Sequence, residues 1–215
     1  TISYQCVKFR CEIGKTNYPK DINNVYTGSN PYLQALFPDC ENGIITAEKQ
    51  GYLSAKLHQT VNVETNEYAV NIPMTKLKQF KVRVHLFEEN VYAAEENKNV
   101  ERELLSTESV LITLKNKNKL YDKIIYFPND ENNVELMVAN EPYEVEIKLI
   151  ENDEIVGKAS YTWQPELEQI QFRNGVLFFV GKIPQSSSNM VEQYQNLQKT
   201  ENKNKAIVEP RLTLG

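Results

Sequence analysis

Apolar and polar residues alternate along many short stretches of this chain, which is the pattern of β-strands that bury one face. In the segment 80–86, apolar residues alternate with basic ones. Val145, Ile147 and Leu149 alternate with charged residues in the same way, and the chain then turns and returns as far as Trp163. We expect these three side chains to face one core together with Trp163, because residues two apart in a strand point to the same side.

Turn-forming residues separate these stretches. The segment 7–10 alternates and is interpreted as part of a half-buried strand. The pair Asn42-Gly43 predicts a tight turn, because both residues tolerate positive φ. A second hairpin is predicted around residues 174–175, with 170–172 in its first strand and 176–180 in its second.

The late part of the chain has a different pattern, because Met190, Tyr194 and Leu197 follow the spacing of one helical stripe. The whole chain therefore contains about ten short strands and one late helix, without the alternation of strands and helices that a parallel sheet needs. We predict an all-β protein with one or two tandem antiparallel β-sandwiches of the Ig-like or prealbumin-like type, followed by a short C-terminal helix and tail.

Three parts of the chain are expected to differ in structure. A seam between two sandwiches is placed in the segment 75–79. The predicted parts are a prealbumin-like sandwich at 1–78, a second Ig-like sandwich at 79–184, and the helix and tail at 185–215.

The charge and hydropathy of the chain bear on its expected partners and location. The 215 residues carry a formal net charge of −5, whereas nucleic-acid-binding proteins usually have a basic patch, so we expect no nucleic-acid partner. No apolar run approaches the roughly 18–20 residues of a membrane helix, and we expect no membrane span. The chain begins at Thr1 without a signal-peptide pattern, as a mature secreted protein does, and we expect a secreted or cell-surface location.

No motif of a catalytic site is found in the sequence. The two histidines, His58 and His85, are both expected to be polar residues that face solvent. There is no Gly-x-Ser-x-Gly elbow, no Gly-rich phosphate loop and no His-Glu-x-x-His motif. We therefore expect no enzymatic activity, no cofactor and no metal, and we do not expect a small-molecule ligand.

Three cysteines are present: Cys6, Cys11 and Cys40. A zinc site needs four ligands at short spacings, and neither histidine lies near these cysteines in the sequence. We predict a disulfide between Cys11 and Cys40, which would close a long loop and fits an oxidising compartment. Cys6 would then be a small buried apolar residue.

Three motifs in the segment 4–78 resemble carboxypeptidase regulatory-like (prealbumin-like) domains, above all those of large secreted archaeal surface proteins. These motifs are Cys6-x4-Cys11-Glu12-Ile13-Gly14-Lys15-Thr16, Phe37-Pro38-Asp39-Cys40-Glu41-Asn42-Gly43 and Ala47-Glu48-Lys49-Gln50-Gly51-Tyr52. The resemblance implies a seven-stranded sandwich in an extracellular protein. It also implies a domain without activity of its own, which supports, spaces or presents other modules.

The expected fold, location and lack of catalytic motifs predict a non-catalytic extracellular structural module. It would be a subunit or domain of a cell-surface assembly, such as a filament, an envelope layer or a stalk. Its partners would be further copies of itself or other surface proteins, joined by strand contacts between subunits. The candidate inter-subunit strand consists of Thr1, Ile2, Ser3 and Tyr4. These residues have the pattern of the start of a strand, and no partner strand lies near them in the sequence.

An alternative is a recognition or adhesion module that binds carbohydrate or protein. Tyrosine rings make good contact surfaces, because they are rigid and combine an apolar ring with a polar tip. Tyr18, Tyr26 and Tyr32 lie in a loop-rich stretch and form the candidate contact surface.

Overall fold

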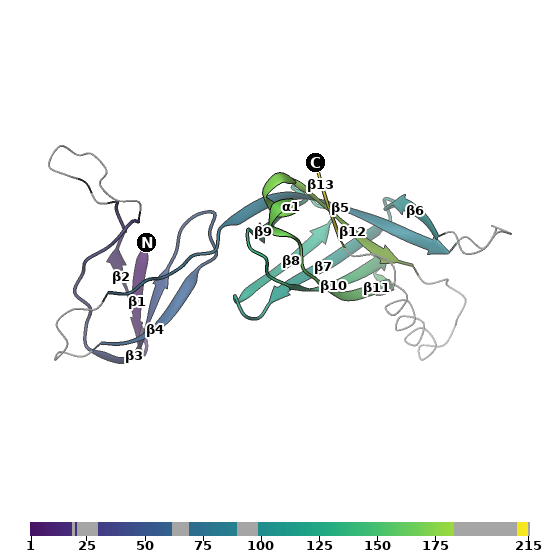
Figure 1. The fold of residues 1–215 in the computed structure, drawn as a ribbon. Coiled ribbons are helices and arrows are strands. Elements are labelled where there is room, and N and C mark those ends of the chain that lie inside the picture. Colours follow the sequence, from purple (N-terminus) through teal and green to yellow (C-terminus); the bar gives the residue numbers. More distant parts are fainter. Residues whose placement is uncertain (19, 21–29, 62–68, 90–98, 183–209, 215) are drawn as a thin grey trace. The chain divides into compact units, whose positions relative to one another are not determined.

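The computed structural model describes residues 1–18, 20, 30–61, 69–89, 99–182 and 210–214 (Figure 1). The chain forms two compact units, Thr1–Leu77 and Lys78–Gly215. The division falls inside the segment 75–79, where the sequence places a seam.

The first unit contains a four-stranded antiparallel sheet with the order β2-β1-β3-β4. The strands are β1 (Ile2–Cys6), β2 (Phe9–Gly14), β3 (Cys40–Ala47) and β4 (Ala55–Val61). Tyr4, Cys40 and Ile45 form its buried core cluster. Phe37 packs edge-on against the Tyr4 ring, with 5.2 Å between the ring centroids. The core of this unit is therefore built around β1 and β3.

Asn42 and Gly43 do not form the predicted turn, because they lie inside β3. Asn42 has a φ of 56°, and the register with β4 shifts between Cys40 and Gly43, as at a β-bulge. A Cβ atom at Gly43 would lie only 2.1 Å from the Tyr4 hydroxyl oxygen. Positive φ is thus used here for a bulge in which the backbone passes close to the Tyr4 ring.

The second unit is a β-sandwich of two sheets. One sheet is antiparallel and has the order β11-β10-β7-β8. The other has the order β13-β12-β5-β6, with β9 also paired to β5. The strands are β5 (Leu77–Glu89), β6 (Asn99–Glu103), β7 (Glu108–Asn116), β8 (Tyr121–Phe127), β9 (Asn133–Met137), β10 (Tyr143–Glu151), β11 (Glu154–Trp163), β12 (Gly175–Gly181) and β13 (Arg211–Thr213). β5 and β12 run parallel, and Figure 1 shows the two strands side by side.

The core of the second unit lies between its two sheets. Val145, Ile147, Leu149 and Trp163 are at most 3% exposed, which confirms that they share a buried face. The Trp163 ring meets the ring of Phe178 on the opposite sheet, with 6.2 Å between centroids. An aromatic contact therefore joins the two sheets at the centre of the sandwich.

The second predicted hairpin is wrong. Its first strand is instead part of the short helix α1 (Leu167–Phe172), which buries Ile170. The Lys78 ammonium donates to the carbonyl oxygens of Ile170, Gln171 and Arg173. These bonds satisfy acceptors at the end of the helix that no later turn can reach, so α1 is fixed to the start of β5.

The end of the chain also differs from the prediction. β13 lies in the segment predicted to be a tail, and it pairs antiparallel with β12. The helix predicted around Met190, Tyr194 and Leu197 lies outside the described residues. Within the described ranges, the protein is an all-β structure with one short helix, and none of its helices is long and apolar enough to cross a membrane.

Candidate functional site

The disulfide of the first unit joins Cys6 to Cys40, so the predicted Cys11–Cys40 pairing is wrong. Cys6 ends β1 and Cys40 begins β3, and these two strands are neighbours in the sheet. Cys11 lies in β2, on the far side of β1 from β3, and it is a free, exposed cysteine. Spacing along the sequence did not reveal which cysteine the sheet places beside Cys40.

The predicted inter-subunit strand at Thr1, Ile2, Ser3 and Tyr4 is also wrong. β1 pairs with β2 on one side and with β3 on the other. The side chains of Ser3 and Tyr4 are buried in the first unit. Both edges of this strand are therefore occupied within the chain, and it has no edge left for a partner.

Among the described residues, β2 and β4 form the two edges of this sheet, and β2 is the edge strand beside β1. Residues 7 and 8 form the hairpin turn, so the strand predicted at 7–10 begins only at Phe9. The Phe9 side chain is 79% exposed, and Arg10, Cys11 and Glu12 are exposed as well. A strand with one free edge and exposed apolar residues is a site where another strand can add.

The charged side of β2 is held by contacts within the chain. The Arg10 guanidinium donates to Ser3 Oγ at 3.0 Å and to Glu48 Oε1 at 2.8 Å. Arg10 and Glu48 both remain about half exposed. The guanidinium is therefore oriented without being removed from solvent.

Two of the three candidate contact tyrosines are brought to the base of one loop. Asn17 and Tyr32 exchange two backbone hydrogen bonds, at 3.1 and 3.0 Å, and Tyr18 follows directly. The exposed fractions of Tyr18 and Tyr32 are 45% and 60%. Tyr26 lies outside the described residues. The structure thus places the backbone of Tyr32 beside Asn17, next to Tyr18 in the sequence, and leaves both tyrosine rings exposed.

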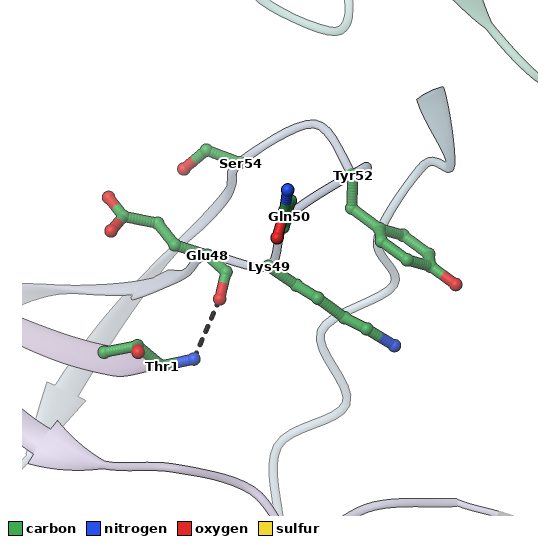
Figure 2. Close-up of a pocket in the computed structure, with 6 residues that line it drawn as sticks. All are labelled: Thr1, Glu48, Lys49, Gln50, Tyr52 and Ser54. Carbon is green, nitrogen blue, oxygen red and sulfur yellow. Dashed lines mark hydrogen bonds between the residues drawn. The ribbon is translucent and has the colours of Figure 1, made fainter. Parts of the chain in front are cut away.

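A surface hollow of about 390 Å³ lies beside β1 and is lined by Thr1, Glu48, Lys49, Gln50, Tyr52 and Ser54 (Figure 2). The Thr1 amine donates to the Glu48 carbonyl oxygen at 2.8 Å. The Lys49 ammonium lies 4.5 Å from the centre of the Tyr52 ring. Both cations of the lining therefore already have partners within the chain.

The two histidines lie in different units. His58 is exposed on β4. His85 lies on β5, where its Nδ1 is 2.5 Å from Glu101 Oε1 and its ring meets Phe179 edge-on. His85 is thus partly buried and contacts a carboxylate, because β6 and β12 flank it. The described part of the chain contains no group of three or more His, Cys, Asp or Glu side chains that could hold a metal.

An ionic network around the buried Glu108 connects the two sheets of the second unit. Arg102 donates two bonds to Glu108, each 2.7 Å long. Lys182 donates to Glu108 at 3.1 Å and to Glu151 at 2.9 Å. The hydrogen bonds from Arg102 lower the pKa of Glu108 to about 2, against the opposing effect of burial. Sequence patterns did not reveal this network, because Lys182 lies 74 residues from Glu108 along the chain and only the fold brings the two together.

Comparison of the chain with protein-family models, with curated proteins and with solved structures found no match. The sheet of the first unit contains no feature specific to prealbumin-like domains. The resemblance therefore stays an expectation that rests on the three sequence motifs alone.

Proposed function

We propose that this protein is a non-catalytic structural module of an extracellular assembly, whose subunits associate through the edges of their β-sheets. The observation that carries this proposal is the open, exposed strand β2 at the edge of the first unit's sheet. Free sheet edges add strands from other chains, because their backbone groups are not paired.

The Cys6–Cys40 disulfide supports the extracellular part of the proposal. Disulfides form and persist in oxidising compartments, and they are rare in the reducing cytosol. This bond fastens the end of β1 to the start of β3, and β1 is the strand on which β2 is mounted. A clamped sheet presents its edge strand in a fixed position.

The second unit has features of a rigid supporting element. The Arg102–Glu108–Lys182 network and the Trp163–Phe178 contact both join its two sheets. Contacts of this kind resist sliding of one sheet over the other, because both partners are held in fixed geometry.

Electron microscopy of the protein as isolated from its source tests this proposal. We expect filaments, layers or other regular multi-subunit particles. Dispersed single chains at every concentration would contradict the proposal. A parallel alkylation experiment without reductant tests the compartment: we expect Cys6 and Cys40 to be protected and Cys11 to be labelled.

A second candidate function is recognition of carbohydrate or protein through Tyr18 and Tyr32. It is favoured by the exposure of both rings and by the backbone bridge between Asn17 and Tyr32, which links the two segments that carry them. A glycan array and a partner pull-down test it, with Tyr18→Ala/Tyr32→Ala as the comparison variant. Binding that the double substitution abolishes would support the recognition function, and absence of any binding by the wild-type chain would contradict it.

A further inference from the structure

We propose that β2 is the contact strand between two copies of this chain, which pair antiparallel along their β2 edges in a register centred on Cys11. The proposal rests on the proposed function, because it names the partner and the surface through which the module assembles. β2 ends the sheet order, and in the part of the chain that the structure describes no strand pairs with its outer edge. All side chains from Phe9 to Glu12 are exposed.

The sequence of β2 is complementary to itself about Cys11. When two identical strands pair antiparallel, residues at equal distances from the centre face one another. Arg10 of each copy then faces Glu12 of the other, and Phe9 faces Ile13. Opposite charges and apolar side chains are thus matched at every position around Cys11, and a twofold axis makes each contact occur twice.

The matched pairs also fall on the correct faces of the sheet. Cys11 lies opposite the buried Tyr4 of β1, so Phe9 and Cys11 are on the core face. Arg10 and Glu12 are on the other face. The apolar contact would therefore continue the core of the first unit from one copy into the next, and the two ion pairs would lie on the face away from it.

The hydrogen-bonding phase of β2 fits the same register. The two-residue turn closes on the pair Cys6–Phe9, which is hydrogen-bonded in such a turn. Because hydrogen-bonded and non-hydrogen-bonded pairs alternate, Arg10 and Glu12 direct their backbone groups to the open edge. Cys11 then faces Cys11 in a non-hydrogen-bonded pair. The Cα atoms of such a pair are about 4.5 Å apart, inside the range of roughly 4.4–6.8 Å that a disulfide spans.

Two other edge strands lack this self-complementarity. If β4 pairs with itself about its middle residue, Lys56 faces Thr60. If β8 pairs with itself in the same way, Asp122 faces Tyr126. Neither arrangement matches opposite charges, so the sequence favours β2 over these two edges as the contact between copies.

Cys11 provides a chemical probe of the register. The thiolate of one Cys11 attacks a sulfur of a low-molecular-weight disulfide, such as oxidised glutathione, and releases one thiol. The thiolate of the second Cys11 then displaces the other thiol from this mixed disulfide. In total, two Cys11 thiols and one oxidant disulfide give one disulfide between the chains and two small thiols.

The test uses the full chain with Arg10→Glu and Glu12→Arg, each alone and mixed. Each single variant places like charges opposite one another in both pairs, whereas the mixture matches opposite charges in both. We expect oxidised glutathione to cross-link the wild-type chain through Cys11. Each single variant should cross-link at about one tenth of the wild-type rate or below, because like charges on directly opposite residues destabilise a strand pair. The equimolar mixture should recover the wild-type rate as a heterodimer, which mass spectrometry identifies.

Matched controls distinguish an effect on the β2 interface from a loss of folding and from assembly through another surface. Lys56→Glu on β4 should cross-link at the wild-type rate, and Cys11→Ser should form no covalent dimer. Glu12→Arg leaves the Arg10 bonds to Ser3 and Glu48 in place, and peptide mapping of Cys6–Cys40 verifies the fold of both variants. Equal rates for wild type and both single variants, or no recovery in the mixture, would overturn the β2 register. If the wild-type chain assembles in that case, the proposed function stands, and if it stays monomeric at all concentrations, both fail.

Discussion

Arg102 of β6 and Glu108 of β7 form a two-pronged ion pair in which the Glu108 carboxylate is completely buried. The Leu105 backbone N–H and the Lys182 ammonium donate to the same carboxylate. A buried charge is tolerated only when it is paired and hydrogen-bonded. Here the pairing also joins the two sheets of the second unit, because β6 and β7 belong to different sheets.

This carboxylate makes the stability of the second unit depend on pH. The pKa of Glu108 is about 2 in the folded protein, below its ordinary value of 4.5, chiefly because Arg102 donates to it. Its contribution is therefore complete above pH 4.5 and is lost as the pH falls toward 2. We expect about 3 kcal/mol to be lost over this range. Urea unfolding followed by the fluorescence of Trp163, the single tryptophan, measures it.

Glu108→Gln tests the assignment of this pH dependence. The substitution leaves the partly buried Arg102 without its ionic partner, and we expect a loss of about 3 kcal/mol at neutral pH. The loss of stability between pH 4.5 and 2 should become much smaller. Glu131→Gln, at an exposed position, is the control and should keep the wild-type slope. An unchanged slope in Glu108→Gln would show that another group is responsible.

Ile147→Ala tests the phase of the central hairpin. Ile147 is completely buried and faces Ala159 and Ile112 on the neighbouring strands. We expect its truncation to cost about 2–5 kcal/mol. Ile124→Ala, on β8 with a 69% exposed side chain, should change the free energy of unfolding by about 0.5 kcal/mol or less. A cost below about 1 kcal/mol for Ile147→Ala would contradict the assigned face.

The disulfide of the first unit is tested by Cys6→Ser. The bond spans a sequence separation of 34 residues, and its loss should cost about 3–4 kcal/mol on the chain-entropy model. Hydrogen exchange measured on peptides of β1 and β3 reports this unit separately from Trp163. Cys11→Ser should leave the exchange rates unchanged. Faster exchange in Cys11→Ser than in Cys6→Ser would mean that Cys11 belongs to the structural disulfide.

Tyr4→Phe is expected to stabilise the first unit slightly. Among the described residues, the Tyr4 hydroxyl has no hydrogen-bond partner, although it is buried. A buried polar group without a partner costs about 1–3 kcal/mol, so its removal should slow hydrogen exchange in β1 and β3. Faster exchange would show that the hydroxyl makes a favourable contact.

The sequence predicted the local parts of the fold well. The alternation in β10, and the pair Asn152 and Asp153 with positive φ at its turn, define a hairpin that needs no information from elsewhere. The helix α1 was predicted as a strand, because Ile170 and Phe172 alternate over too few residues to distinguish a helix. The burial of Ile170 and the bonds from Lys78 favour the helix.

The pairing of strands that are distant in the sequence could not be predicted, for a different reason. The position of β1 between β2 and β3 decides that Cys6, and not Cys11, lies beside Cys40. The same arrangement makes β2 an edge strand in place of the first residues of the chain. Sequence patterns report the faces of a strand, but they do not report which strands flank it, and the candidate site depends on that order.

Sedimentation velocity of the full 215-residue chain, measured over a series of concentrations without reductant, shows whether copies of this protein associate. We predict that the sedimentation coefficient rises with concentration as subunits associate. The Arg10→Glu and Glu12→Arg chains should each sediment more slowly than wild type until the two are mixed. A wild-type chain that sediments as a monomer at every concentration would contradict the claim that this protein is a subunit of an assembly.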